Sequence, residues 1–181
     1  MVGESRAAVL VEVVSPGLPT LRALADGDVG VAARTSGLPM IAYLTEPDLR
    51  RAWGLRYEQV RADSSVAAWT TGVVLDRQRG ICVGCAGYHG PPDARGMVEV
   101  GYAIDPQYRR RGYARAALEV LLDRAARAPG VRVVRASIGQ DNQPSLALVS
   151  GYGFVRVGEQ LDPIDGVEFV YEVAARTGRL R

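Results

Sequence analysis

The sequence predicts a mixed α/β domain, of the α+β kind, in which helices flank a partly antiparallel, partly parallel sheet. Three features of the 181-residue chain predict it. The middle of the chain holds two strand-like segments joined by a polar turn. A strand, a loop, an amphipathic helix and a further strand come next. A short helix and a hairpin then close the pattern.

The first part of the chain, residues 1–65, is helical and irregular by pattern. Thr20 is a candidate cap for a short helix over 21–25. Thr45 is a candidate cap for a longer helix with Pro47 in its first turn. We expect this segment to belong to the same domain as the core at 66–175 and to shape one side of its site, with 176–181 as a solvated tail.

Alternation and turn residues predict three strands in the middle of the chain. They span residues 67–76, 81–88 and 97–104, with a Gly- and Pro-rich loop over 90–96 before the last. On this third strand Val98, Val100, Tyr102 and Ile104 share one face, and Glu99 and Gly101 lie on the other.

The clearest helix lies at 114–125, where apolar residues recur at i, i+3, i+4, i+7, i+8 and i+11. A strand at 131–138 follows, so the third strand and this one should form a parallel pair with a right-handed crossover. A short helix from Asn142 through Ser150 and a hairpin with an Asp165-Gly166 turn complete the pattern.

Composition excludes several classes of protein. The formal net charge is +2 and 48% of residues are apolar, so no global field favours nucleic acid or a membrane surface. No apolar run is long enough to span a bilayer, and no secretory signal is evident, which predicts a cytoplasmic protein without membrane partners.

Cys82 and Cys85 form a C-x-x-C pattern. They fall on a predicted strand, where residues three apart should face opposite sides, rather than at the helix N-terminus that a redox dithiol requires. With one histidine and no second cysteine pair, the chain lacks ligands for a structural zinc site. We expect two small strand residues and no metal.

The loop from Asp105 to Ala114 is the most informative segment. It leads into the amphipathic helix, whose first N–H groups lack internal partners and, with the helix dipole, form an anion site. Gly112 lets the backbone approach a ligand, and three arginines add positive charge. The alternatives are a solvated charge run or a nucleic-acid contact. Neither a dinucleotide fingerprint nor a phosphate loop of the Walker type is present.

This segment resembles a known family. Arg109-x-x-Gly112-x-Ala114 matches the Q/R-x-x-G-x-G/A motif of Gcn5-related N-acetyltransferases (GNAT). The motif follows Glu99-Val100-Gly101-Tyr102 and precedes Asn142-x-x-Ser145 and Gly153-Phe154. The series is similar to the branch that acetylates the N-termini of ribosomal proteins. The resemblance covers about residues 66 to 173.

The resemblance implies the GNAT fold, a mostly antiparallel sheet with a central parallel pair that splays apart. It implies acetyl-coenzyme A as co-substrate, an amine acceptor (a protein N-terminus or a small molecule), and a monomer or homodimer. Metal ions and nucleic acid are not implied. The residues that it assigns to coenzyme A are Tyr102, Ala103, Ile104, Arg109, Arg110, Arg111, Gly112, Tyr113, Ala114, Asn142 and Ser145.

The resemblance also suggests catalytic residues. Glu99 is the candidate general base, acting directly or through a water. Many relatives place a tyrosine, as acid for the thiolate, at the position of Val149; Ser145 is the substitute here. Asn142 could orient the coenzyme or cap the short helix. His89 is a candidate residue of the acceptor site, and an exposed ion-paired carboxylate remains the alternative for Glu99.

The missing tyrosine keeps a second function open. The fold could bind an acyl-coenzyme A without turnover, as a sensor or interaction module. Binding without any release of thiol in the presence of amines would identify that function.

Overall fold

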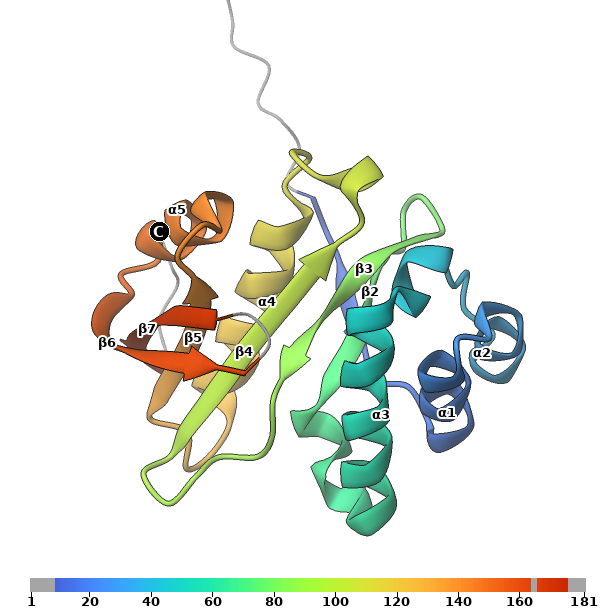
Figure 1. Cartoon of the computed structure of the whole chain (residues 1–181), viewed down its shortest axis with the longest axis horizontal. Helices are drawn as coiled ribbons and strands as arrows, with labels where there is room; N and C mark the ends of the chain where they lie inside the picture. The colour runs from blue at the N-terminus through green and yellow to red at the C-terminus, as the bar shows by residue number, and fades with distance from the viewer. Residues whose placement is uncertain (1–8, 164–165, 176–181) are drawn as a thin grey trace, which may run out of the picture.

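The computed structural model describes residues 9–163 and 166–175. Its strands form one seven-stranded sheet in the order β1-β2-β3-β4-β5-β7-β6 (Figure 1). The strands are β1 (Glu12–Val14), β2 (Thr71–Asp76), β3 (Ile81–Tyr88), β4 (Met97–Ile104), β5 (Val133–Gly139), β6 (Val155–Asp162) and β7 (Gly166–Ala174). The α-helices are α1 (Leu18–Asp26), α2 (Val29–Ser36), α3 (Pro47–Ala62), α4 (Tyr113–Arg127) and α5 (Gln143–Ser150). Three 3₁₀ helices join them: η1 (Ala42–Thr45), η2 (Ser64–Trp69) and η3 (Pro106–Tyr108).

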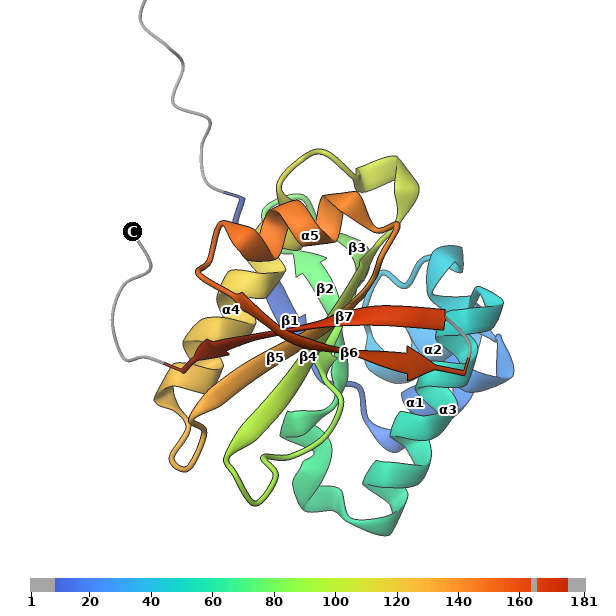
Figure 2. The ribbon, with the colours of Figure 1, turned by 60° about the vertical axis from the view of Figure 1, so that its left-hand side comes forward.

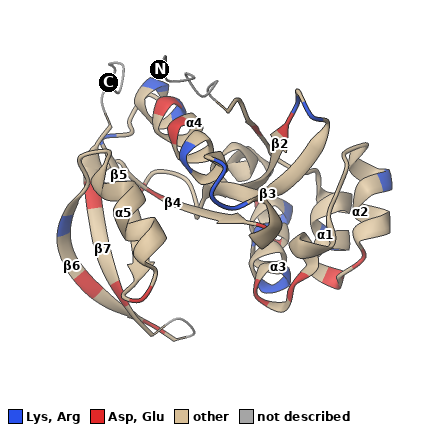
Figure 3. Ribbon diagram, turned by 90° about the horizontal axis from the view of Figure 1, so that it is seen from above, with Lys and Arg blue, Asp and Glu red and all other residues tan. Residues whose placement is uncertain are grey.

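The sheet is antiparallel except for its central pair. Strands β4 and β5 are parallel, with α4 as the crossover between them, so the predicted mixed sheet is confirmed. They pair only over Met97–Glu99 and Val133–Arg135. Beyond that point β4 keeps its other neighbour, β3, as far as Ile104. Figure 3 shows β5, β7 and β6 diverging from β4 and β3.

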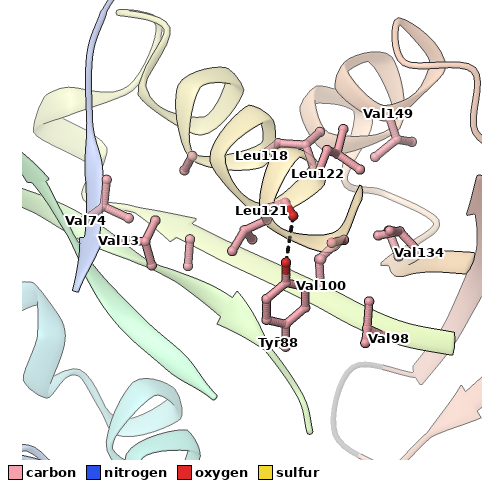
Figure 4. Packing of buried hydrophobic residues seen from close by; sticks show 14 of the residues in the cluster. Val13, Val74, Tyr88, Val98, Val100, Leu118, Leu121, Leu122, Val134 and Val149 are labelled. Atoms are coloured by element: carbon pink, nitrogen blue, oxygen red, sulfur yellow. Dashed lines mark hydrogen bonds between the residues drawn. The ribbon is translucent and has the colours of Figure 1, made fainter. Parts of the chain in front are cut away.

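One hydrophobic core lies between the sheet and α4. Leu118 and Leu121 are fully buried against Val98 and Val134, which come from the two parallel strands (Figure 4). The Tyr88 hydroxyl donates to the carbonyl of Leu121 at 2.6 Å, which satisfies this buried polar group. Each such leucine contributes about 2 kcal/mol on burial, so α4 is held firmly where the chain leaves β4.

A second core lies on the opposite face of the sheet, beneath α1 and α3. Leu21, Leu24 and Trp53 are buried against Val73 and Leu75 of β2. The Trp53 indole N–H donates to the carbonyl of Leu44 at 2.9 Å, tying α3 to η1. The sheet is thus covered on both faces, with α4 on one side and the N-terminal helices on the other (Figure 2).

The N-terminal helices differ in detail from the sequence prediction. The first begins at Leu18 rather than after Thr20, and the Thr20 hydroxyl is buried against that of Thr35 at 2.9 Å. Glu46, not Thr45, precedes α3, because the Thr45 hydroxyl donates instead to the carbonyl of Ala42 inside η1.

Three elements differ from the sequence prediction: α2 and β1 were not predicted, and β2 is shorter than predicted. Helix α2 is capped by Asp28, whose carboxylate accepts from the Val31 N–H at 2.8 Å. Strand β1 pairs with β2. The strand predicted over 67–76 starts only at Thr71. Asp63 caps the preceding η2 through the Ser65 N–H, which diverts residues 64–69 from the extended conformation.

The prediction that Cys82 and Cys85 face opposite sides is wrong. Both pack into the core beneath α1 and α3. The register slips at Val83, because Val74 pairs with Gly84 while Leu75 pairs with Cys82, and this bulge returns both thiols to one face. Burial raises the pKa of Cys82 to about 11 and that of Cys85 to about 12, so both are inert thiols at neutral pH.

The C-terminal hairpin is confirmed, because β6 residues Val155–Asp162 pair antiparallel with β7 residues Gly166–Glu172. Asp165 of the predicted turn and the predicted tail at 176–181 lie outside the described residues. Within 9–163 and 166–175, no helix has the length and apolar character that crossing a bilayer requires. The same residues contain no cluster of three or more histidine, cysteine or acidic side chains placed to hold a metal ion.

Candidate functional site

The loop between β4 and α4 presents free backbone N–H groups. Arg110 has φ of 63° and Gly112 has φ of 90°, so the chain passes twice through the left-handed region before the helix starts. No side chain caps α4, and Ala116 is the first residue whose N–H reaches back to Gly112 O, at 3.0 Å. The N–H groups of residues 113–115 therefore point out of the helix end, where its dipole favours an anion.

The three arginines of this loop have different roles. Arg109 donates through Nε to the carbonyl of Ile104 at 2.9 Å, which fixes the end of β4. The Arg111 guanidinium lies 5.9 Å from the centre of the Tyr108 ring. Arg110 lines the cavity described next. The loop leading into α4 is a positively charged stretch in Figure 3.

A cavity of about 820 Å³ extends from this loop along the end of β4 to α5. Ten of the predicted coenzyme residues line it: Tyr102, Ala103, Ile104, Arg109, Arg110, Gly112, Tyr113, Ala114, Asn142 and Ser145. Tyr113 contributes backbone, because its side chain is buried and its hydroxyl donates to Asp76 at 2.8 Å. Of the predicted residues, all of them described, Glu99 and Arg111 line neither this cavity nor the next.

A second cavity, of about 680 Å³, lies between the diverging strands β4 and β5. It is bordered by Gly101 and His89 on one side and by Ser137 on the other. Tyr102, Asp141, Asn142 and Ser145 line both cavities, so the two meet at these residues. The two cavities therefore lie side by side at these residues, the first beside the start of α4 and the second between the parted strands.

The parting of β4 from β5 leaves backbone groups without a ladder partner on one side. From Val100 onward β4 pairs with β3 alone, and β5 pairs from Ala136 to Gly139 with β7 alone. Buried backbone groups need hydrogen-bond partners, so this open edge can accept an extended ligand in the manner of an added strand.

His89 lines the second cavity and Glu99 does not, so the imidazole lies between Glu99 and this cavity. The Glu99 carboxylate is 3.8 Å from His89 Nδ1, and 21% of the Glu99 side-chain surface is exposed against 48% for His89. The pKa of His89 is lowered, mainly because the surrounding protein penalises its charged form; Glu99 opposes this shift and Arg56 adds to it. Neutral imidazole at pH 7 can accept a proton.

Arg56 supports this pair from α3. Its side chain is buried and donates to the His89 carbonyl at 3.1 Å and to the Thr71 hydroxyl at 3.2 Å. A Cβ added to Gly101 would lie 2.7 Å from His89 Nε2, so the glycine leaves the room that the imidazole occupies. The ring is thus held over β4 at the mouth of the opening.

On the other side of the opening, Asn142 caps α5. Its side-chain oxygen accepts from the Ser145 N–H at 3.2 Å, which confirms the predicted cap and leaves the amide NH₂ free to face the cavities. Position 149 holds a valine, completely buried in the core, and so brings no hydroxyl to the site.

Two hydroxyls at the site are buried and have no hydrogen-bond partner among the described residues. They belong to Tyr102 of β4 and Ser137 of β5. Ser137 was not identified from the sequence, and neither was Asp141. Their positions beside the opening follow from where β4 and β5 separate, which alternation alone does not reveal.

Comparisons with known proteins agree with this geometry. The Acetyltransferase (GNAT) domain family matches residues 20–155. The "Uncharacterized N-acetyltransferase YjdG" of Bacillus subtilis (strain 168) is 30% identical over 83 residues, which cover 46% of this chain and 49% of that protein, about half of its length.

Solved structures share the fold at low sequence identity. A chimera of the spermidine N-acetyltransferase SpeG from Vibrio cholerae and hSSAT has a TM-score of 0.65 at 15% identity, covering 91% of this chain and 95% of that one. RimJ from Mycobacterium smegmatis, in complex with CoA-disulfide, has a TM-score of 0.63 at 18% identity, covering 91% and 82%. The ribosomal-protein-S5-alanine acetyltransferase of Vibrio fischeri has a TM-score of 0.63 at 18% identity, covering 93% and 94%. From its sequence and its fold together, this chain belongs to the GNAT acetyltransferase family.

Proposed function

We propose that this protein transfers an acetyl group from acetyl-coenzyme A to a primary amine, directly and without a covalent enzyme intermediate. The observation that carries the proposal is the pair of adjoining cavities at the point where the sheet parts. An anion site at the start of α4 opens into a cavity that meets a second cavity where β4 and β5 part. A long thioester and an amine can therefore meet from opposite sides.

Coenzyme A fits the first cavity. The N–H groups that precede Ala116 would hold its pyrophosphate, with the Arg110 side chain adding charge. The amide-containing pantetheine arm would pair with the open edge of β4 at Tyr102 to Ile104. The Asn142 amide, free on its NH₂ side, would donate to a pantetheine carbonyl.

The amine acceptor would enter the second cavity. Asp141 and Glu168 line this cavity, and their charge favours a cationic amine over a neutral or anionic acceptor. The names of two structural neighbours, a spermidine N-acetyltransferase and a ribosomal-protein-S5-alanine acetyltransferase, cover both small-molecule and protein amines. Both acceptor classes therefore belong in the test.

The chemistry needs the amine as free base. In the proposed reaction its nitrogen attacks the thioester carbonyl, and the excess proton of the nitrogen passes to the pair formed by His89 and Glu99. The carbon–sulfur bond then breaks and the thiolate leaves toward α5, where the Ser145 hydroxyl is placed to hydrogen-bond the sulfur. The products are the acetylated amine and coenzyme A.

The test is a screen of the full chain with acetyl-coenzyme A against amines. The panel contains polyamines, amino acids, aminoglycosides and peptides with free N-termini, and release of thiol is followed together with the mass of the product. We expect acetylation of at least one class, with cationic amines preferred. An absence of product with every amine, in a protein that binds coenzyme A, would contradict the proposal.

The second candidate is a non-catalytic acyl-coenzyme A sensor or interaction module. The buried Val149 favours it, since the hydroxyl that many relatives carry at that position is absent. Calorimetry and the amine screen separate the two: a sensor binds acetyl-coenzyme A with heat and releases no thiol.

A further inference from the structure

Tyr43 of η1 is the contribution of the N-terminal region to the first cavity. Every other described residue that lines this cavity comes from β4, from the loop and helix that follow it, or from α5 and the residues just before it. The Tyr43 side chain is partly buried, and acetyl transfer as proposed gives it no role. One wall of the coenzyme cavity is therefore supplied by a segment that lies far from the loop motif in sequence.

The turn that carries Tyr43 is anchored on its other side. The next residue, Leu44, is fully buried in the core beneath α1 and α3, and its carbonyl accepts from the Trp53 indole N–H at 2.9 Å. The Tyr43 carbonyl accepts from the Glu46 N–H at 3.1 Å, just before α3 begins. A ligand would thus meet a ring that is already in place, which lowers the ordering cost of binding.

Tyr43 lies beside the end of β4, on the face of the sheet opposite α4. Burial raises the pKa of Tyr43, the neighbouring Arg109 side chain lowers it to a smaller extent, and Cys85 raises it. Cys85 pairs with Ala103 of β4, and both pack in the core beneath α1 and α3. Arg109 in turn donates to the Ile104 carbonyl at 2.9 Å. The phenol is therefore protonated at neutral pH and next to the last residues of the open edge.

The proposed place of the pantetheine arm is this same edge. The arm would pair with β4 at Tyr102 to Ile104, where β5 no longer pairs, between α5 on one side and η1 on the other. Near its pyrophosphate end the arm carries two methyl groups and a hydroxyl, so it presents both apolar surface and a polar atom. A tyrosine side chain matches this mixture, because it combines a large apolar ring with a hydrogen-bonding hydroxyl.

We propose that Tyr43 is a binding residue for the pantetheine arm of coenzyme A, with its ring packed on the arm from the η1 side. This inference rests on the proposed use of acetyl-coenzyme A and adds a residue outside the loop before α4. Its hydroxyl, beside Arg109, orients the ring. The N-terminal region then serves both substrates, because Arg56 of α3 donates to the carbonyl of His89 at the second cavity.

The first experiment measures by calorimetry how wild type, Tyr43→Leu and Tyr43→Phe bind two ligands. Coenzyme A carries the arm, whereas adenosine 3′-phosphate 5′-diphosphate is its nucleotide half without the arm. We expect Tyr43→Leu to bind coenzyme A about 10-fold more weakly and the nucleotide within about twofold of wild type. Tyr43→Phe keeps the ring and should lose no more than about threefold in affinity for coenzyme A.

The matched control is Tyr57→Leu. Tyr57 of α3 is partly buried against the same N-terminal core, lies 5.6 Å from the Arg22 guanidinium and lines neither cavity. We expect this variant to bind both ligands as wild type does, and denaturant unfolding checks the fold of every variant. A loss of affinity in Tyr57→Leu equal to that in Tyr43→Leu would trace the effect to a disturbed core and overturn the contact.

The second experiment uses wild type and Tyr43→Phe, so it does not depend on the folding of Tyr43→Leu. Nuclear Overhauser effects from the methyl protons of the bound arm should reach the ring protons of one tyrosine. That ring is assigned to Tyr43 when its signal is the one that Tyr43→Phe replaces. Effects that reach only other rings of the cavity, such as that of Tyr108, overturn the inference.

The outcomes separate this inference from the proposed function. Unchanged affinity of Tyr43→Leu for coenzyme A, or an equal loss for both ligands, overturns the contact with the arm, while acetyl transfer stands if wild type acetylates an amine. A loss confined to coenzyme A, in a protein that acetylates no amine, supports the contact and overturns the proposed function. A folded wild type that binds neither ligand overturns both.

Discussion

The two halves of β4 have the same alternating pattern and opposite surroundings. Over Met97–Glu99 the strand pairs with β5 on one side, and on the other side the N–H groups of His89 and Asp93, in the loop between β3 and β4, donate to the Glu99 and Met97 carbonyls. Over Val100 to Ile104 it has β3 on one side and two cavities on the other. The closed half stabilises the sheet, and the open half presents backbone and side-chain groups to ligands.

This difference shows how a site can arise inside a sheet without a long insertion. A ladder that stops after three residue pairs exposes backbone donors and acceptors in the middle of the molecule. It also places residues of β4 and β5 around the same opening, so that groups from both strands can contact one substrate. The predictions below test whether the two halves differ in this way.

The largest expected effect is that of Glu99→Gln. Glu99 is the last residue of β4 that pairs with β5. Turnover should fall about 1,000-fold at neutral pH, because the His89–Glu99 pair loses its charge, while the affinity for coenzyme A stays the same. Steady-state kinetics and calorimetry measure the two. The control is Glu58→Gln, an exposed partner of Arg61 on α3. Unaltered turnover would remove Glu99 from the mechanism.

Next in size is Gly112→Val at the anion site. A side chain at φ of 90° is strained and would distort the turn that presents the free N–H groups of α4, so coenzyme A should bind about 100-fold more weakly. Gly130→Val is the matched control, since Gly130 has φ of 87° at the far end of α4, next to neither cavity. Equal affinities of the two variants in calorimetry would contradict the site.

The closed half is tested by Val98→Ala. Val98 is 1% exposed, and loss of two methyl groups from this core should lower the free energy of unfolding by about 2 kcal/mol. Denaturant unfolding measures it. Val157→Ala on β6, where the side chain is 55% exposed, should change stability by less than about 0.5 kcal/mol. Similar values for the two variants would show that the closed half is not part of the core.

A pH profile tests the role of His89. Its neutral form accepts the proton, so kcat/KM should fall about tenfold per pH unit on the acid side of a pKa below the usual value of about 6.5. Around this ring, Arg56 of α3 lowers the pKa and Glu99 of β4 raises it. Glu99→Gln should therefore move the acid limb to lower pH. If the fall of kcat/KM at low pH occurs at the same pH in Glu99→Gln as in the wild type, His89 is not the titrating group.

The smallest effect is expected for Ser137→Ala on the open half of β5. Its hydroxyl is buried and unpaired among the described residues, so its removal should change the free energy of unfolding by less than about 1 kcal/mol, toward greater stability. The control is Ser36→Ala, whose hydroxyl donates to the Ala32 carbonyl at 2.7 Å and should cost about 1 kcal/mol. A larger loss at Ser137 would reveal a hidden hydrogen bond.

Local patterns predicted the part of the chain that would form the proposed anion site. The bounds of β3 and β4 agree with the sequence prediction to the residue, and α4 differs by one or two residues, because alternation and an apolar helical stripe are set by neighbours in sequence. Pairing with distant segments was harder to predict. The bulge at Val83 places Cys82 and Cys85 on one face, and only the register with β2 reveals it.

At the candidate site, too, local patterns predicted the backbone roles but not how the side chains are arranged. Gly112 and Asn142 were predicted from turn and cap chemistry, and both have the expected backbone roles. Glu99 was predicted beside the thioester, yet His89, ten residues earlier, stands between it and the second cavity. The place of Ser137 beside the opening depends on where β4 and β5 separate, which no local pattern encodes.

Hydrogen exchange of the backbone amides, with and without coenzyme A, tests the central claim most directly. Saturating coenzyme A should slow exchange at residues 100–104 and 110–115 and leave Met97–Glu99 unchanged, because the ligand completes only the open half of β4 and the end of α4. Protection confined to other segments, or none at all in folded protein, would contradict it.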